Sequence, residues 1–557
     1  MKKRIICLLL GMLMVASSLL MAGCNNGDTG FDDEEERLAT TLHLMIPTGE
    51  STTAEAVSAV QDALNSIFGS KYKTRIVIDA VSEDEYLEKL TERFDAQEKA
   101  AKEAEEAKES RKKAEKEAKK RGETLPPLET EPEVTGDVTV MNELGFTETV
   151  YPELEEHQID IFFLSGIDNL WDFYEDERLA YLDDDLGSSS KKLADFIHPT
   201  FIEAAKLGGS SVAVLNNHTI GEYTMLLINK ELADKYYYDT TGYKTLADAV
   251  EFIEDMAVSE PEYTPFLEEV DTPNFIRWSD DESFYGADVN SSNVFGKATS
   301  PITMFQSNSF QSYYSIMRLF EEKGYFSEDP ENDDKFAAAV VKGSLEDKLA
   351  YEEKYYVTVL QVPVALNDDI YAGMFCVNGH NTNKEVSRSM EIITLLNTDS
   401  TVRNLLQYGV EGLHYKLNAN GEVVRLNDDY SMNILHTGNS FVAYPEEGMS
   451  KDAWEYGKQQ NLDSTTYSIL GYSFSEKDAA LFAPNATLYD EIWETLENAT
   501  YDQLTKTTGE DNPYNIVTDI LRFQDRQGNV SVYNSVTNAG DESHFAARLN
   551  EWYNSNF

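Results

Sequence analysis

The order of apolar and polar residues predicts alternating strands and helices near the start of the chain. Leu and Ile occupy every second position over residues 42–46, which is typical of a strand. Apolar residues then recur at helical spacing over residues 57–68, and a β-rich run follows at 76–78. Ser82–Glu85 has the capping-box pattern that opens a second helix. This strand, helix, strand, helix order predicts an α/β fold with a parallel sheet and crossover helices.

Later segments continue the same alternation. Residues 159–164 are almost wholly apolar and predict a buried strand, which ends in a polar loop that begins at Ser165. Apolar residues at helical spacing over 390–396 predict an amphipathic helix, and residues 397–400 open another. Turn-forming residues at Asn418–Gly421 predict a hairpin.

One long segment is charged on every side. Ala96–Arg121 consists almost wholly of Ala, Glu, Lys and Arg, with opposite charges four residues apart, as in Glu98 and Lys102. We predict a solvated helix within an insertion at residues 95–140 of a lobe. Leu, Ile and Val are absent from any heptad seam, so a coiled-coil partner face is the weaker alternative.

The first residues predict export and a lipid anchor. Three basic residues precede an apolar run from Ile5 to Met21, which is typical of a secretory signal and too short for a stable membrane span. Leu20–Cys24 resembles a lipobox, with Met21 where Leu is usual. We expect a signal peptide at 1–23, lipidation of Cys24 at the extracellular face of the cell membrane, and a disordered polar tether at 24–38. The alternative is an ordinary signal peptide with an incidental cysteine.

Charge and cysteine content exclude several classes of protein. The chain carries a net charge of −54, and removal of the three basic residues in 1–23 leaves −57, so a nucleic-acid-binding role is excluded. Apart from Cys24, Cys376 is the one cysteine beyond the expected signal peptide, and its apolar neighbours predict a buried small hydrophobe without disulfides. Roughly 530 remaining residues exceed one ordinary core and predict two or more lobes. The 31 tyrosines suit the flat faces of sugars, although packing alone also accounts for them.

Many segments together resemble the extracellular solute-binding proteins of family 1, the maltose-binding-protein-like receptors. They occur in the family's order and cover most of residues 40–445. Two positions depart from the family pattern: Leu215 replaces a proline and Leu246 replaces a tryptophan. The segments that carry the resemblance are Asp160–Phe162, Leu179–Asp183, Gly208–Asn217, Glu222–Leu232, Tyr243–Asp248, Tyr356–Pro363, Asn383–Asn397, Leu406–Tyr415 and Thr437–Phe441.

The resemblance implies a two-lobed periplasmic-binding-protein type II fold with a hinged cleft. Lobe 1 is expected to comprise residues 39–220 and 366–425, and lobe 2 residues 221–365 and 426–557. The implied function is capture of a small-molecule solute, a sugar or oligosaccharide, by a monomer that delivers it to the permease subunits of an ABC importer. The resemblance implies no enzyme activity, no cofactor and no metal.

The expected ligand-binding residues follow from the same resemblance. Hydroxyl, amide and carboxylate groups in two loops of lobe 1 can bond to sugar hydroxyls; the alternative is that they only cap the following helices. Glu222 stands where the maltose-binding type has a cleft carboxylate, and Tyr223 adjoins it. Trp171 and Trp278 have polar, loop-like neighbours and present indole faces for a pyranose ring. The remaining expected residues are Gly49, Glu50 and Ser51 after the first strand, Ser165, Asp168 and Asn169 after the buried strand, and Asn439 and Phe441, by likeness to a lipoprotein branch of the family.

Other functions remain open on the sequence alone. The chain contains no His-Glu-x-x-His, Gly-x-Ser-x-Gly, P-loop or EF-hand pattern. With 100 acidic residues, carboxylate pairs for glycoside hydrolysis arise by chance and identify nothing. Asp183–Asp185 could bind calcium, but solvated acidic runs usually do not. The alternatives are a surface glycan-binding or sensor lipoprotein without transport and, less favoured, a lipoprotein glycosidase.

Overall fold

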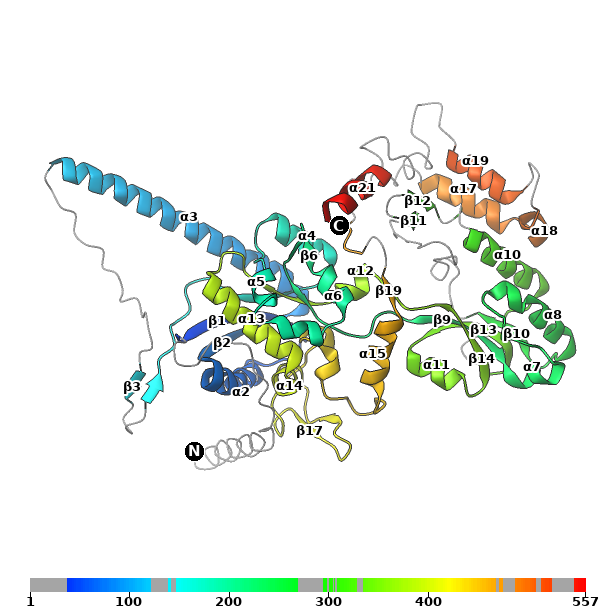
Figure 1. The fold of residues 1–557 in the computed structure, drawn as a ribbon, viewed down its shortest axis with the longest axis horizontal. Helices are drawn as coiled ribbons and strands as arrows, with labels where there is room; N and C mark the ends of the chain where they lie inside the picture. The colour runs from blue at the N-terminus through cyan, green and yellow to red at the C-terminus, as the bar shows by residue number, and fades with distance from the viewer. Residues whose placement is uncertain are drawn as a thin grey trace.

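The computed structural model shows two α/β lobes, each built on its own sheet (Figure 1). The α/β class predicted from the sequence is confirmed. Cys24, the expected signal peptide, nearly all of the expected tether and Trp278 lie outside the described residues. The structure describes residues 38–121, 139–141, 147–268, 294–297, 300–303, 305, 308–327, 334–466, 470–473, 486–506, 512–522 and 545–556.

The sheet of lobe 1 has five strands in the order β2-β1-β5-β16-β8. The strands are β1 (Thr40–Thr48), β2 (Thr74–Ser82), β5 (Ile161–Leu164), β8 (Val214–Leu215) and β16 (Met374–Val377). β1 runs parallel to β2 and β5, whereas β16 is antiparallel to both β5 and β8. The carboxyl ends of β1, β2, β5 and β8 therefore lie at one edge of the sheet.

Strand β1 is buried along its whole length. The alternation of Leu and Ile had suggested a strand with one buried face, yet His43 and Met45 are also buried, 3% and 2% exposed. The reason is that β1 lies between two parallel neighbours, β2 and β5, and parallel strands are usually covered by helices on both faces. Helix α2 (Ala54–Tyr72) buries Val60 and Leu64 against this core, as its spacing predicted.

Helix α3 (Glu83–Arg121) is one continuous helix of 39 residues. The two helices expected from Ser82 and from Ala96 are joined, because neither Gly nor Pro interrupts the sequence between them. Its first turns bury Tyr86, Leu90 and Phe94 in lobe 1, and the charged part extends away from the lobe (Figure 1). The predicted end of the charged helix at Arg121 is confirmed.

The sheet of lobe 2 has four strands in the order β10-β13-β9-β14. β10 and β13 are parallel and the other pairs are antiparallel. Alternate residues of β9 enter two different cores: Leu226 and Ile228 belong to one, Met225 and Leu227 to the other. Both faces of this sheet are therefore covered. The strands are β9 (Tyr223–Asn229), β10 (Thr264–Glu268), β13 (Phe336–Gly343) and β14 (Tyr355–Gln361), with helices α7 (Lys230–Tyr236), α8 (Val250–Ser259), α10 (Asn308–Lys323) and α11 (Leu345–Tyr351).

The remaining elements complete the two lobes. The predicted helices near 390 and 400 and the hairpin at 418–421 are confirmed as α13 (Asn383–Thr398), α14 (Ser400–Tyr408) and the pair β17 (Tyr415–Leu417) and β18 (Val423–Arg425). The other helices are α4 (Ile167–Glu175), α5 (Asp183–Leu186), η2 (Lys191–Asp195), α6 (Pro199–Ala204), η3 (Leu246–Ala249), α12 (Asn367–Ile370), η6 (Ile434–His436), η7 (Ser440–Val442), α15 (Ala453–Asp463), α17 (Ala486–Glu497), α18 (Tyr501–Leu504), α19 (Pro513–Arg522) and α21 (Phe545–Asn556). The other strands are β3 (Thr139–Met141), β4 (Thr147–Thr149), β6 (Lys206–Leu207), β7 (Ser210–Ser211), β11 (Val294–Lys297), β12 (Ser300–Thr303), β15 (Val364–Ala365) and β19 (Thr465–Thr466).

Two segments connect the sheets directly: residues 216–222 between β8 and β9, and residues 362–373 between β14 and β16. We call them the first and the second crossing. Helix α15 holds the first crossing through Asn461, whose Nδ2 donates to the carbonyl of His218 at 2.8 Å. His218 is held within this crossing as well, because its Nδ1 lies 2.8 Å from the carbonyl of Asn216.

Among the described residues, the helices are all too short or too polar to cross a membrane. Cys376 lies in β16, fully buried and without a disulfide, as its apolar neighbours predicted.

Candidate functional site

The candidate site lies at the edge of the first sheet that adjoins the crossings. β8 ends at Leu215 and continues into the first crossing, so the carboxyl ends of β1 and β5 lie at the edge from which the chain passes to lobe 2. Ligands of open α/β sheets bind beyond the carboxyl ends of the strands. We define the hinge-side edge as residues 49–52, residues 165–168 and residues 431–436.

The loop after β1 is fixed to a distant segment of the chain. The amide of Gly49 donates to the carbonyl of Ser431 at 3.0 Å, and the Thr52 hydroxyl donates to the same carbonyl at 3.1 Å. A Cβ atom on Gly49 would lie 2.9 Å from the Ser431 hydroxyl oxygen and 3.1 Å from its Cβ, so a side chain here would have to displace Ser431. Glu50 and Ser51 are exposed. Helix α2 is capped instead by Thr53, so the capping alternative does not describe Gly49, Glu50 or Ser51.

The loop after β5 leads directly into helix α4. Gly166 has φ +84° and donates its amide to the carbonyl of Tyr371 in the second crossing at 2.8 Å. Ser165 and Asp168 are exposed. The Asn169 amide donates to the Ser165 carbonyl at 2.7 Å and so closes the loop. Asp168 lies in the first turn of α4, where the helix dipole favours a carboxylate.

Trp171 lies inside helix α4, whereas its polar neighbours had suggested a loop. The helix continues because Leu170 and Phe173 are buried at helical spacing and hold it against the lobe. The indole N–H of Trp171 donates to the carbonyl of Gly471 at 3.0 Å. The Ser473 hydroxyl donates to Asp168 at 2.6 Å, so two side chains of α4 hold the segment 470–473 at this edge.

Glu222 and Tyr223 have different environments although they are adjacent. Glu222 is exposed at the end of the first crossing. Tyr223 is 2% exposed, and its ring packs with Met225 in the lobe 2 core. The Tyr223 hydroxyl donates to a carboxylate oxygen of Asp463 at 2.7 Å. Burial, together with this carboxylate, raises the pKa of Tyr223.

Asn439 and Phe441 are part of the packed interior. Asn439 is 1% exposed, and its side-chain amide donates to the carbonyls of Phe196 at 3.1 Å and Asn397 at 3.2 Å. Phe441 is 8% exposed and makes an edge contact with Trp454, with ring centroids 6.1 Å apart. The structure therefore places both residues beneath the surface, where Asn439 attaches the chain after residue 437 to lobe 1 and Phe441 packs it against helix α15.

Residues 431–436 are at the hinge-side edge although sequence reasoning did not single them out. Asn433 is exposed, and the carbonyl of Leu435 accepts a hydrogen bond from Asn216 in the first crossing at 2.8 Å. The ring of His436 lies 4.5 Å from that of Phe163, and its Nδ1 lies 3.3 Å from a carboxylate oxygen of Glu83. Burial lowers the pKa of His436 to about 4, so the ring is neutral near pH 7.

Two side chains of helix α14 hold this segment in place through hydrogen bonds to its backbone. Arg403 is fully buried, and its guanidinium donates to the carbonyl of Ile434 at 2.8 Å and to the side chain of Gln407 at 3.1 Å. Gln407 in turn donates to the carbonyl of Met432 at 2.8 Å. Burial lowers the pKa of Arg403 to about 9. These bonds fix the backbone of residues 432–434 relative to lobe 1.

The exposed side chains near the crossings share one chemical character. They are carboxylates, hydroxyls and an amide, which together accept and donate hydrogen bonds to neighbouring hydroxyl groups of a ligand. Within the described ranges, no group of three or more His, Cys, Asp and Glu side chains is placed to hold a metal ion. Six of these exposed residues are Glu50, Ser51, Ser165, Asp168, Glu222 and Asn433.

The chain is similar to a sugar-transport protein over about half of its length. A carbohydrate ABC transporter substrate-binding protein from Streptococcus pneumoniae serotype 4 is 24% identical over 313 residues, which cover 51% of this chain and 61% of that protein. The chain thus spans about three fifths of the length of this relative. No family model matches the chain.

Solved structures with similar folds cover most of the chain. The N-glycan transport solute binding protein NgtS from Streptococcus pneumoniae is 16% identical, with a TM-score of 0.46 over 93% of this chain and 99% of that one. An extracellular solute-binding protein from Bifidobacterium longum subsp. infantis is 13% identical, with a TM-score of 0.44 over 93% and 98%. One from Staphylococcus aureus, in complex with maltose, is 12% identical, with a TM-score of 0.38 over 86% and 95%.

Proposed function

We propose that this chain is the solute-binding component of an ABC importer and binds a sugar or oligosaccharide between its two lobes. The observation that carries the proposal is the similarity to a carbohydrate ABC transporter substrate-binding protein. The arrangement of two sheets joined by two crossings supports it, because closure about such a hinge buries a ligand and creates a distinct closed form. The permease subunits of the importer are the proposed partners.

The proposed contacts are side chains that the fold leaves exposed near the crossings. Glu50, Ser51, Ser165, Asp168 and Glu222 bond to sugar hydroxyls, and Asn433 joins them from residues 431–436. A carboxylate or an amide can form hydrogen bonds to two adjacent hydroxyls at once. Such a pair of bonds discriminates between sugars, because it depends on the relative orientation of the two hydroxyls.

Other residues expected to bind ligand have supporting roles in this proposal. Gly49 lets Ser431 approach the loop after β1, and Asn169 closes the loop after β5. Tyr223 joins β9 to α15. Trp171 contributes only the exposed part of its ring, because its N–H is bonded to Gly471. Asn439 and Phe441, described above, fix the chain after residues 431–436.

The site is tested by calorimetry against a panel of oligosaccharides, with conservative variants of two exposed carboxylates. Asp168→Asn and Glu222→Gln are each expected to weaken binding of a panel member by tenfold or more, since a hydrogen bond to a charged group contributes about 1.5–3 kcal/mol. Asp172→Asn is the matched control, because Asp172 is an exposed carboxylate on the same helix. Equal affinity of Asp168→Asn and Asp172→Asn contradicts the proposed role of Asp168.

The ligand class is tested by the same panel. Binding of peptides or amino acids without any glycan contradicts the carbohydrate part of the proposal and leaves the receptor part standing. Transport is tested separately, by uptake of the bound sugar into cells with and without this chain. Unchanged uptake alongside tight binding favours a glycan-binding lipoprotein without transport.

A further inference from the structure

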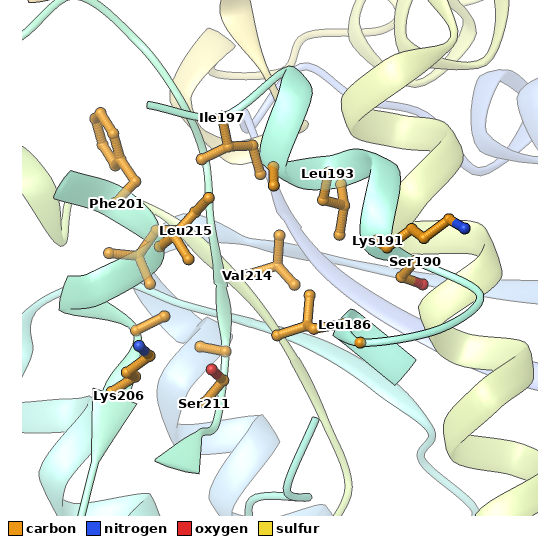
Figure 2. Close-up of a pocket in the computed structure, with 15 residues that line it drawn as sticks. Leu186, Ser190, Lys191, Leu193, Ile197, Phe201, Lys206, Ser211, Val214 and Leu215 are labelled. Carbon is orange, nitrogen blue, oxygen red and sulfur yellow. The ribbon is translucent and has the colours of Figure 1, made fainter. Parts of the chain in front are cut away.

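Lobe 1 contains a cavity of about 260 Å³ that is separate from the proposed sugar contacts (Figure 2). It lies between edge strand β8 and the short helices η2 and α6. None of the six proposed sugar contacts lines it. The lining residues are Leu186, Gly187, Ser190, Lys191, Leu193, Ala194, Ile197, Phe201, Ile202, Ala205, Lys206, Ser211, Ala213, Val214 and Leu215.

The lining is mostly hydrocarbon, with two lysines and two serines. Ten of the fifteen lining side chains are aliphatic or aromatic, and Leu186, Leu193 and Val214 surround the central space in Figure 2. The charged lining residues are Lys191 and Lys206, with no Asp or Glu. In a chain with 100 acidic and 46 basic residues, a lining without a carboxylate departs from the overall composition. Charge therefore favours an anionic group at the rim over a cationic one.

The two lysines differ in how they are engaged. They lie at opposite ends of the apolar group in Figure 2. The Lys206 ammonium is paired with Glu203 at 2.8 Å. Lys191 is exposed, and within the described part of the chain its ammonium has no ion-pair partner. Ser190, next to it, is fully buried, and its hydroxyl accepts a hydrogen bond from Thr394 at 2.9 Å. Lys191 is thus the cation available at this rim.

We propose that this cavity binds the alkyl chain of an aliphatic carboxylate, with the carboxylate at Lys191. Apolar cavities exclude water and take up apolar molecules, because no polar partners exist inside to hold water. At roughly 30 Å³ for a group of the size of water, the cavity accommodates about nine such groups, which corresponds to a chain of about eight to ten carbons. An ammonium and a carboxylate then form a charge-assisted hydrogen bond at the opening. The site does not depend on sugar binding.

The test uses decanoate as the probe and calorimetry as the measurement. The protein is the chain without residues 1–24, which comprise the expected signal peptide and the cysteine expected to carry the lipid, so no detergent is needed that could compete for the cavity. We expect saturable binding of one decanoate per chain and at least tenfold weaker binding of butyrate. Val214→Phe fills the space from β8 and Leu193→Phe from η2; each is expected to weaken decanoate at least tenfold. Lys191→Gln is expected to weaken decanoate several-fold and leave decanol unchanged.

The controls make each outcome decisive. Lys99→Gln removes an exposed lysine on α3, and its decanoate affinity is expected to equal that of the parent chain. Circular dichroism and thermal melting establish that a cavity variant is folded. One folded variant of the two is enough to test the cavity assignment. Undiminished binding in a folded Val214→Phe or Leu193→Phe chain overturns the cavity assignment. Equal binding of decanol and decanoate, or no effect of Lys191→Gln, overturns the assignment of the carboxylate.

Discussion

Asp369 accepts a hydrogen bond from the backbone amide of Gly221 at 2.7 Å, and this bond ties the second crossing to the first. Its other carboxylate oxygen lies 3.2 Å from His218 Nε2. Gly221 has φ +48°, and a Cβ atom there would lie 3.1 Å from the carbonyl of Val364. The two crossings are therefore packed backbone to backbone at one point.

Gly221→Ala is expected to lower the free energy of unfolding by about 1–3 kcal/mol, because alanine is strained at this φ and its Cβ meets the second crossing. Urea unfolding measures the change. Gly242→Ala is the control, since a Cβ there meets no atom within 4 Å and the backbone has no left-handed φ. Its effect is expected to stay within about 0.5 kcal/mol. Equal stability of the two variants argues against a tight junction at Gly221.

Arg178 is expected to fasten α3 to lobe 1 through the shape of its guanidinium as well as its charge. It is 7% exposed, bonds to Asp95 at 2.7 Å and Glu98 at 3.0 Å, and lies over the ring of Phe94 at 5.4 Å. Arg178→Lys keeps the charge but loses the forked bonds and the ring contact, so we expect a loss of about 1–3 kcal/mol in unfolding free energy.

The comparison for Arg178 is Arg111→Ala, which removes an i,i+4 ion pair with Glu115 on the projecting part of the same helix. Such a pair contributes about 0.3–0.5 kcal/mol. Chemical unfolding of both variants separates the two contributions. If Arg178→Lys unfolds at the same denaturant concentration as the parent chain, charge alone accounts for the contact.

The pKa of His436 predicts a loss of stability in acid. Burial lowers its pKa from 6.5 to about 4, so the fold favours the neutral ring. The resulting stabilisation is fully present above pH 6.5 and is lost as the pH falls toward 4. At about 1.4 kcal/mol for each pKa unit, the loss reaches about 3 kcal/mol.

His436→Gln is expected to flatten the stability curve between pH 6.5 and pH 4, as measured by urea unfolding at each pH. The difference from the parent curve isolates this residue from other buried histidines such as His43, whose pKa burial lowers to about 3. His380→Gln is the control, because that side chain is 44% exposed. Parallel curves for the parent chain and His436→Gln show that the ring is not held neutral.

Cys24→Ser is expected to release the protein from membranes, since the proposed anchor is a lipid on the Cys24 sulfur. Fractionation of cells that produce the parent chain and the variant measures the effect. Cys376→Ser serves as the comparison, because Cys376 is fully buried and has no route to lipidation. Retention of Cys24→Ser in the membrane fraction contradicts the anchor.

Local patterns in the sequence determined the elements and the class of fold. Repeats of two and of about four residues lie within short windows, and they predicted β1, α2, β5 and α13 because each strand or helix has a face that must be buried. Turn residues predicted the hairpin near Asn418 for the same local reason. The apolar neighbours of Cys376 predicted its burial.

Tertiary packing decided which side chains remain at the surface of the candidate site. Tyr223 and Asn439 are polar residues at the expected positions, yet their partners Asp463 and Asn397 approach from distant parts of the chain and bury them. Ser431 meets Gly49 across nearly 400 residues, and no local pattern marks that meeting. A window of sequence encodes the propensity to form a helix or strand, whereas burial depends on which elements pack together. The sequence alone therefore determined two α/β lobes. Only the tertiary structure decided which side chains are exposed at the hinge-side edge.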